Sequence, residues 1–431
     1  MSKRIVLATF GSLGDIHPVI AIALELKQRG HQPIIATGND HRAKIESEGI
    51  TFYPIPPHLD PYSELAKRTM DLQNGTEVLF REVIMPQIRD THNELMQIVP
   101  TADLLITSEL IYTAPIIAKL TGVPWISYVL SPMSFFSAYD PPVFAPFPFL
   151  AELRSLGPGV NGLIIEAAKF VTRGWSEPLQ ALRSEFGLPA LSNPLFEGKY
   201  SHSLVLALFS SYLAQPQPDW PANTHIAGFA FYDSDNRNLL PQHPTNTTLQ
   251  PELLEFLEAG SAPIVFTLGS SAVLNPGNFY SESIRAVRQL GCRAVLLVGK
   301  NILTTPLNQD IVAFDYAPYS EIFKRAAAVV HQGGVGTTGQ GLQAGCPMLV
   351  VPWSHDQPDN AARIVRLGVA CAIPRNEYTA TKAVEKLDKL LNDPIYKIKA
   401  GEVGRQVRSE NGTQAACDAI EKMLLTNGSS N

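Results

Sequence analysis

The stretch AAAVVHQGGVGTT, residues 326–338, is the most informative part of this chain. A short apolar run ends in a histidine, and three glycines and two threonines follow at once. The run is typical of a buried strand in a parallel sheet, and the glycines predict a tight turn into a helix that begins near residues 336–337. A helix N-terminus offers unpaired N–H groups and the positive end of a dipole, so the stretch favours an anion site. A turn that only packs strand against helix would read the same way, and both readings stay open at this point.

The same alternation of strand, glycine loop and helix recurs along the chain. RIVLATF at residues 4–10 predicts a first strand, and the helix after it has Pro18 in its first turn and ends at Gly30. A second opening of this kind, APIVFTLGSSAV, lies at residues 262–273. Repeated units of this pattern indicate two α/β domains with parallel sheets, which bind ligands at the carboxyl ends of their strands.

The composition restricts the class of protein. A chain of 431 residues exceeds one ordinary core and predicts two domains of about 200 residues. The net charge of −6 argues against a nucleic-acid partner. The four cysteines have no CxxC spacing and favour a reducing, cytoplasmic setting. The N-terminus reads as a strand rather than a signal peptide, and no run is long enough to cross a membrane, which leaves only peripheral membrane contact open.

The domain boundaries follow from a change in composition. The last strand of the first half is expected near residues 203–210, and a stretch rich in Pro, Asn, Asp and Gln comes after it. We therefore expect a first domain at 1–215, a connection at 216–250, a second domain at 251–405, and a C-terminal helix at 406–431 that packs back on the first domain.

The segment around the opening stretch resembles a known family. Residues 314–361, FDYAPYSEIFKRAAAVVHQGGVGTTGQGLQAGCPMLVVPWSHDQPDNA, resemble the donor-binding signature of the family 1 nucleotide-sugar glycosyltransferases. Within that family, GGVGTT…GLQAGCP is similar to sterol glucosyltransferases, and SPMSFFSAYDPPV is similar to bacterial glycolipid rhamnosyltransferases. The resemblance implies the GT-B fold, in which two Rossmann-like domains have parallel sheets facing an interdomain cleft. The N-terminal domain would bind the acceptor and the C-terminal domain the nucleotide sugar.

The resemblance also implies roles for individual residues of the second domain. Two serines, the signature histidine and the start of the following helix would hold the diphosphate, and Tyr316 and Ala317 would hold the base. The diphosphate residues are Ser270, Ser271, His331, Gly334, Gly336, Thr337 and Thr338.

Asp356 and Gln357 match the pair that reads the sugar hydroxyls. A carboxylate accepts from two hydroxyls, while an amide both donates and accepts. The alternative is a capped helix start. One departure concerns the nucleotide: many relatives carry a ribose-binding glutamate at the position of Gly339, although the sterol-type relatives also lack it.

Two residues of the first glycine loop, GSLGDIHP, are candidates for the catalytic base. An inverting transfer needs a base that takes the proton of the acceptor hydroxyl. We expect Asp15 to have this role, with His17, at an apparent N-cap beside Pro18, as the alternative. The nearby helix N-terminus favours the charged form of Asp15 and so a weak base. Plant-type relatives have an aspartate where this chain has Ser108, and the neighbouring Glu109 is a further candidate to assist.

The segment SPMSFFSAYDPPVFAPFPFL, residues 131–150, has six aromatic residues and five prolines and cannot form a regular helix. It follows a strand end, so we expect it to line an apolar acceptor pocket. The alternative is a loop that only covers the core. The expected pocket residues are Phe135, Phe136, Tyr139 and Phe144.

The motif DSD at residues 233–235 imitates the metal-binding DxD of the other large glycosyltransferase fold. Its setting is rich in Asn and Pro, where aspartates are commonly solvated turn residues, so we expect no metal and no bound cofactor. The resulting hypothesis is a metal-independent, inverting enzyme that moves glucose from UDP-glucose to a lipophilic acceptor. A dTDP-rhamnose-dependent glycolipid rhamnosyltransferase is the alternative within the class, and a nucleotide-sugar epimerase is the alternative outside it.

Overall fold

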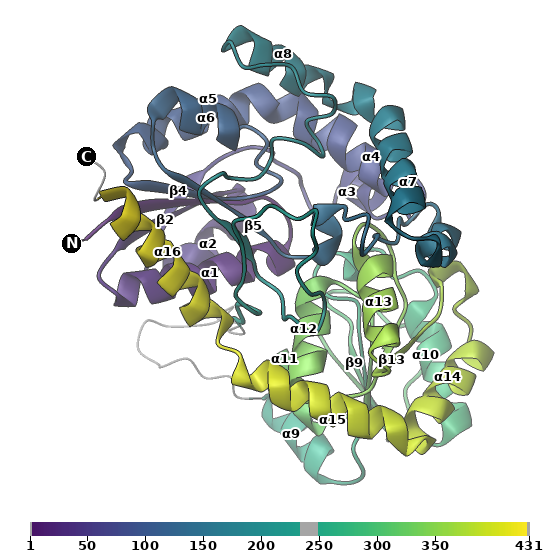
Figure 1. Cartoon of the computed structure of the whole chain (residues 1–431). Coiled ribbons are helices and arrows are strands. Elements are labelled where there is room, and N and C mark those ends of the chain that lie inside the picture. The colour runs from purple at the N-terminus through teal and green to yellow at the C-terminus, as the bar shows by residue number, and fades with distance from the viewer. Residues whose placement is uncertain (1, 233–248, 429–431) are drawn as a thin grey trace. The chain divides into compact units, whose positions relative to one another are not determined.

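The computed structural model describes residues 2–232 and 249–428, which form two compact units (Figure 1). The first unit contains residues 2–69, 73–232 and 411–428. The second contains Met70–Leu72 and the described residues from 249 to Glu410. Each unit has its own parallel sheet, which confirms the expected α/β class with two Rossmann-like sheets.

The first sheet has seven strands in the order β3-β2-β1-β4-β5-β6-β7, and every pairing is parallel. The strands are β1 (Arg4–Ala8), β2 (Gln32–Thr37), β3 (Thr51–Pro54), β4 (Leu104–Ser108), β5 (Trp125–Val129), β6 (Val205–Ala207) and β7 (Thr224–Ile226). The helices of this unit are α1 (Leu13–Gln28), α2 (Arg42–Ser47), α3 (Glu64–Thr69), α4 (Gly75–Val78), α5 (Ile88–Ile98), α6 (Ala114–Thr121), α7 (Pro158–Val171), α8 (Glu177–Glu185) and α16 (Gly412–Gly428).

The second sheet has six strands in the order β10-β9-β8-β11-β12-β13, again all parallel. The strands are β8 (Ile264–Thr267), β9 (Ala294–Leu297), β10 (Ile311–Phe314), β11 (Ala328–His331), β12 (Met348–Val350) and β13 (Ala370–Ala372). The helices are α9 (Pro251–Glu258), α10 (Phe279–Leu290), α11 (Tyr319–Ile322), α12 (Val335–Ala344), α13 (Gln357–Arg366), α14 (Ala380–Asn392) and α15 (Pro394–Ser409).

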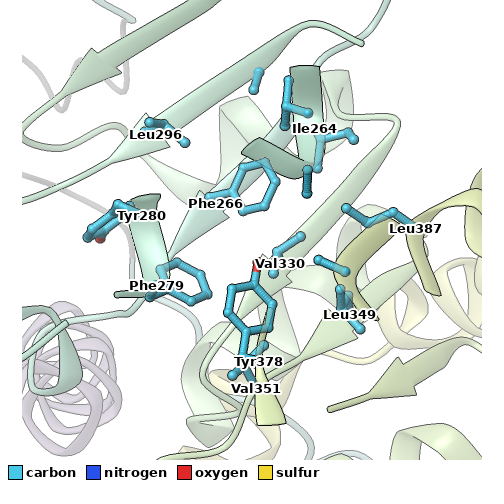
Figure 2. Packing of buried hydrophobic residues seen from close by; sticks show 14 of the residues in the cluster. Ile264, Phe266, Phe279, Tyr280, Leu296, Val330, Leu349, Val351, Tyr378 and Leu387 are labelled. Atoms are coloured by element: carbon cyan, nitrogen blue, oxygen red, sulfur yellow. The ribbon is translucent and has the colours of Figure 1, made fainter. Parts of the chain in front are cut away.

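The core of the second unit shows why its strands read as continuous apolar runs. Side chains from β8, β11 and β12 pack with Phe279 and Tyr280 of α10 and with Leu387 of α14 (Figure 2). The opposite face of β11 is buried as well, since Val329 has no exposed surface. Strands covered on both faces require apolar residues at successive positions. The strand AAAVVH was predictable for this reason.

The C-terminal helix α16 packs against α1 of the first unit (Figure 1). Ala416, Cys417 and Ile420 are fully buried there, in the same cluster as the apolar face of α1. Arg29, just after α1, makes ion pairs with Asp418 at 2.6 Å and with Glu421 at 2.7 Å. The chain therefore returns to its first unit after completing the second.

Three details differ from the sequence-based expectations. The last strand of the first sheet is β7, beyond the expected 203–210, and the first unit runs to Tyr232 rather than to residue 215. Helix α1 begins at Leu13, so Pro18 lies inside it, past its first turn. Helix α12 begins at Val335, slightly before the expected 336–337.

The strand orders place ligand-binding edges in both units. In each sheet, the second and third strands of the chain lie on one side of the first strand, and the fourth and later strands lie on the other side. This switch occurs between β1 and β4 in the first sheet and between β8 and β11 in the second. Ligands of open α/β sheets bind outside the carboxyl ends of the strands at this switch point. We therefore expect the ligand-binding and catalytic residues in the loops that follow these four strands.

Candidate active site

The loop after β1 in the first unit brings Asp15 back onto its own helix terminus. Ser12 is the N-cap of α1, and its hydroxyl accepts a hydrogen bond from the Gly14 amide at 3.3 Å. The Asp15 Oδ2 accepts from the Ser12 amide at 2.7 Å and from the Ser12 hydroxyl at 3.3 Å. This reciprocal arrangement is a capping box, which satisfies N–H groups that the helix leaves unpaired.

Burial decides the basicity of Asp15. It raises the pKa of the carboxyl to about 6; the Ser12 hydrogen bonds work against this rise, and the nearby Glu109 carboxylate adds to it. The expectation that the helix terminus would keep Asp15 a weak base is therefore wrong, because desolvation outweighs the dipole. Gly11 makes the burial feasible: its φ is +139°, and a Cβ there would lie 2.1 Å from Oδ2 of Asp15.

His17 lies inside α1 and is not the N-cap that the sequence suggested. Its ring packs edge-on against Tyr232, with the ring centroids 5.1 Å apart. Burial lowers the pKa of His17 to about 3, and Coulombic interactions with Lys44 and His41 contribute to this shift. A group with so low a pKa is a weaker base than Asp15 at neutral pH, and Asp15 stays the predicted base with His17 as the alternative.

The end of β4 carries Ser108 and Glu109, as the sequence indicated. Ser108 is buried beside the hydroxyl of Tyr128, with which its own hydroxyl interacts. Glu109 accepts from the Lys199 ammonium at 2.7 Å and from the Ser134 hydroxyl. The carboxylate of Glu109 is thus held in a buried ion pair, which leaves it poorly placed to take a proton.

The aromatic segment after β5 divides into buried and accessible parts. Phe135 is stacked on Trp220 with centroids 4.2 Å apart and lies in the core, so it does not line an accessible pocket. Phe136 has a left-handed backbone, with φ of 48°, and stacks with Phe144 at 6.4 Å. Tyr139 is half exposed, at 52%. The loop therefore both completes the core and presents aromatic surface.

In the second unit, His331 is the last residue of β11 and is fully buried. Its Nδ1 accepts a hydrogen bond from the Gly333 amide at 3.0 Å. Burial lowers the pKa of His331 to about 3, so the ring is neutral and carries its proton on Nε2. No partner for Nε2 is present among the described residues, so a buried N–H donor is available at the expected diphosphate position.

The start of α12 adds further donors beside His331. Gly334 is its N-cap without a capping side chain, and Gly336 and Thr337 lie in the first turn, whose N–H groups a helix leaves unpaired. The hydroxyl of Thr338 is buried without a partner among the described residues. Because unpaired buried polar groups are costly, their concentration here indicates a ligand rich in hydrogen-bond acceptors.

Gln332, directly after β11, was not predicted from the sequence to contribute to the site. Its amide nitrogen is 2.2 Å from where a Cβ on Gly269 would be and 2.8 Å from the corresponding position on Gly334. A side chain at either glycine would require the Gln332 amide to move, and Gly269 also has a φ of +65°, which favours glycine. The half-buried Ser270 and Ser271 follow directly, so the serine loop and the α12 terminus are neighbours.

The candidate base-binding residues follow β10. Tyr316 is half-buried and stacks on Tyr319, with centroids 6.4 Å apart. The hydroxyls of Tyr319 and Thr267 lie 2.7 Å apart, which fixes this aromatic pair to β8. Ala317 is buried, so only its backbone is available to a ligand.

Asp356 and Gln357 lie at the start of α13, and both readings of the sequence apply to them. Asp356 is at the N-cap position but makes no side-chain cap. The Gln357 Oε1 accepts from the backbone amides of Trp353 at 2.7 Å and Ser354 at 3.2 Å. The acceptor end of this amide is thus structural, which leaves its donor end for sugar hydroxyls.

Comparison with known proteins identifies the family. A model of the glycosyltransferase family 28 N-terminal domain matches residues 5–109, and one of the erythromycin biosynthesis protein CIII-like C-terminal domain matches residues 295–423. The chain is 28% identical to an O-mycaminosyltylonolide 6-deoxyallosyltransferase of Streptomyces fradiae over 98% of both chains. Together these matches support a family 1 glycosyltransferase of the GT-B fold.

Two further similarities bear on this glycosyltransferase. It is 27% identical to a sterol 3-beta-glucosyltransferase of Leptosphaeria maculans, covering 97% of this chain but 29% of that longer protein. The crystal structure of the glycosyltransferase VinC in complex with dTDP matches with a TM-score of 0.66 at 19% identity, over 98% of this chain and 100% of that one. The identification as a hexosyltransferase removes support from the epimerase alternative.

The remaining expectations concern the metal site, membrane contact and the ribose. The DSD motif at 233–235 lies outside the described residues. Within residues 2–232 and 249–428, no three His, Cys, Asp or Glu side chains gather as a metal site would require. In the same ranges, every helix is too short or too polar to cross a membrane. Gly339, the position discussed for the ribose, is buried in α12.

Proposed function

We propose that this glycosyltransferase is inverting and metal-independent. It would move a hexose, glucose from UDP-glucose, to a hydroxyl of a lipophilic small molecule such as a sterol, polyphenol or lipid. The observation that carries the proposal is that His331 Nε2 and Thr338 Oγ1, at the junction of β11 and α12, are buried without a hydrogen-bond partner among the described residues; the acceptor Gln332 Oε1 is also unpaired there. A diphosphate supplies the acceptor oxygens that the two donors and the helix N-terminus need.

The reaction itself follows from the charge of Asp15. In a direct displacement, the acceptor oxygen forms a bond to the anomeric carbon while the bond from that carbon to the diphosphate breaks. Asp15 takes the hydroxyl proton, and the diphosphate leaves with the electron pair of the broken bond. A carboxylate with a pKa of about 6 is ionised at neutral pH, yet is a stronger base than an ordinary aspartate.

The leaving group is stabilised by neutral donors. The neutral His331 would donate from Nε2, and the first turn of α12 would donate from its backbone. Fixed donors in a site of low dielectric stabilise developing negative charge without reorganisation. No metal ion is required for this task, so we expect turnover in EDTA to equal turnover in untreated buffer. A large loss that Mg²⁺ or Mn²⁺ restores would contradict the metal-independent part of the proposal.

Two features support an apolar acceptor. The stacked pair Phe136 and Phe144 gives the loop after β5 aromatic surface suited to a lipophilic molecule. Phe147 and Phe149, in the same segment, are exposed by 53% and 61%, which supports contact with a lipid surface. The four cysteines have free thiols, in keeping with a reducing, cytoplasmic compartment.

A second candidate donor is a dTDP-activated deoxysugar such as dTDP-rhamnose. One relative is named a 6-deoxyallosyltransferase, and VinC was crystallised with dTDP. The absence of a carboxylate at Gly339 also removes a partner for the ribose hydroxyls, of which a deoxyribose has one fewer. These observations favour this candidate independently of the sterol-type resemblance.

The donor can be tested without knowledge of the acceptor. UDP, dTDP, UDP-glucose, dTDP-glucose and dTDP-rhamnose are screened by thermal shift, and the stabilising sugar is then offered with a panel of sterols, polyphenols and lipids. We expect UDP and UDP-glucose to raise the melting temperature most and UDP-glucose to support transfer with inversion. Preference for dTDP sugars would establish the second candidate, and stabilisation by no nucleotide would contradict both.

A further inference from the structure

The turn that carries His331 is pressed against the start of α13. Gly333 has a φ of +91°, and a Cβ there would lie 2.8 Å from Val350 Cγ1 and 3.0 Å from the Gln357 backbone oxygen. No larger residue fits without displacing one of them. The loop assigned to the diphosphate and the loop assigned to the sugar are therefore in direct contact, through backbone as well as side chains.

Asn360 connects these two loops by hydrogen bonds. Its side chain is fully buried in α13, and its amide nitrogen donates to the Gly333 backbone oxygen at 3.0 Å and to Asp356 Oδ2 at 2.8 Å. A primary amide nitrogen has two hydrogens, so both are used. The Asn360 backbone amide also donates to the Asp356 backbone oxygen at 2.9 Å, as the helix continues. One residue thus connects the turn after β11 to the carboxylate expected to read the sugar.

We propose that Asn360 is a positioning residue for the donor sugar, which holds the Asp356 carboxylate in a fixed place relative to the turn that carries His331. This inference rests on the proposed function, since it assigns the sugar to Asp356 and the diphosphate to that turn. Asn360 itself touches neither. Its effect is to make the two contacts parts of one rigid site, so that a sugar is accepted only when its hydroxyls and its diphosphate fit together.

The chemistry of the position explains why asparagine suits it. Both groups to which the Asn360 amide nitrogen donates are acceptors, a carbonyl oxygen and a carboxylate, so the side chain must supply two donors. Serine supplies one donor and alanine none. Aspartate would bring a third acceptor into a buried space between two others, which is strongly unfavourable. A displacement of about 1 Å of a positioning group costs on the order of 100-fold in rate.

The inference is tested by separating nucleotide binding from sugar recognition. The variants are Asn360→Ala, Asp356→Asn and the double variant, and the probes are UDP and dTDP in calorimetry. Transfer is measured with UDP-glucose and its 4-epimer UDP-galactose, with the dTDP sugars in parallel. We expect Asn360→Ala to keep the Kd for the nucleoside diphosphate within about threefold while kcat/KM for the preferred sugar falls about 30-fold and the preference over the epimer shrinks.

The double variant decides whether Asn360 acts through Asp356. If it does, Asn360→Ala adds less than about threefold to the loss already caused by Asp356→Asn. Losses that multiply would overturn the inference. So would a parallel weakening of nucleoside diphosphate and nucleotide sugar, since that result would make Asn360 only a support of the turn.

A matched control comes from the first unit. Asn193 is also fully buried, and its amide nitrogen donates to the Lys169 backbone oxygen at 2.9 Å and to the Thr172 hydroxyl at 3.0 Å. Asn193→Ala should lower stability comparably and leave the sugar preference unchanged.

A second variant serves if Asn360→Ala does not fold. Asn360→Ser retains one donor and should show a smaller loss of sugar preference with the nucleotide affinity kept; an unchanged sugar preference in that folded variant would count against the inference. A wild-type protein that binds no nucleoside diphosphate would instead refute the proposed function.

Discussion

At the scale of single residues, two opposing effects act on the pKa of Asp15, and the larger of them sets its direction. A helix N-terminus and the Ser12 hydrogen bonds favour the carboxylate, whereas burial disfavours it. The sequence reveals the first influence, because Asp15 stands near an expected helix start. It does not reveal the second, which depends on side chains distant in sequence that exclude water. The sequence thus predicts a candidate base, but it could not predict the raised pKa of that carboxyl.

A pH profile measures that basicity. Because the base must be ionised, we expect kcat/KM to be constant above about pH 7 and to fall tenfold for each pH unit well below the Asp15 pKa of about 6. Asp15→Asn should lower kcat by about 100- to 10,000-fold, abolish this acidic limb, and leave nucleotide affinity unchanged. His17→Gln is the control, and it should retain both the activity and the fall of kcat/KM at acidic pH. Full activity in Asp15→Asn, or loss of the limb only in His17→Gln, would transfer the role to His17.

His331 should act as a neutral donor over the whole physiological range. With its pKa near 3, it has no proton to gain between pH 6 and 8, so the affinity for UDP-glucose should be independent of pH there. His331→Ala removes one hydrogen bond to a charged group, worth about 1.5–3 kcal/mol, and should raise the Kd about 10- to 100-fold. Calorimetry at several pH values checks both statements. An affinity that rises steeply as the pH falls towards 6 would indicate a cationic imidazole instead.

At the scale of elements, the start of α1 couples structure to chemistry. Ser12 both caps the helix and donates to the Asp15 carboxylate. The motif Ser12…Asp15 is the spacing of a capping box, so the helix start was in principle readable, but Pro18 suggested a later start because proline favours first turns. In contrast, β11 and α12 were placed to within about two residues, since an apolar run followed by glycines has few alternatives.

Removal of the cap should change stability and pH dependence together. Ser12→Ala should lower the free energy of unfolding by about 1 kcal/mol. It should also move the acidic limb to higher pH, because the hydroxyl no longer stabilises the charged form of Asp15. Thr379→Ala is the matched control: Thr379 caps α14 by accepting from the Lys382 amide at 3.4 Å, far from Asp15 in sequence. Thr379→Ala should lower the free energy of unfolding without moving the acidic limb of the pH profile. An equal shift of that limb in both variants would show that the Ser12 cap does not control the pKa of Asp15.

At the scale of the whole molecule, duplication made much of the architecture predictable. Two sheets of the same doubly wound order place candidate residues at equivalent switch points, after β1 and β4 in one and after β8 and β11 in the other. What the sequence could not show were contacts between separated segments. Gln332 lies between Gly269 and Gly334, and Asn360 reaches Gly333; neither contact leaves a pattern in the spacing of residues.

The return of the chain to its first unit has a consequence for stability. Ile420 of α16 is fully buried against the cluster that includes the apolar face of α1. Ile420→Ala should lower the free energy of unfolding by about 2–5 kcal/mol while the Kd for nucleotide stays the same, since the nucleotide residues belong to the second unit. Ile395→Ala, at a position exposed by 44%, is the control and should cost less than about 0.5 kcal/mol. A large effect on nucleotide affinity would contradict this assignment.

The central claim is that buried neutral donors at the junction of β11 and α12 hold the leaving diphosphate. A crystal structure of the enzyme with UDP or dTDP tests it most directly. The account predicts a diphosphate oxygen about 3 Å from His331 Nε2, with others accepting from backbone amides in the first turn of α12. A diphosphate bound at any other strand end, with His331 Nε2 still unpaired, would contradict the account.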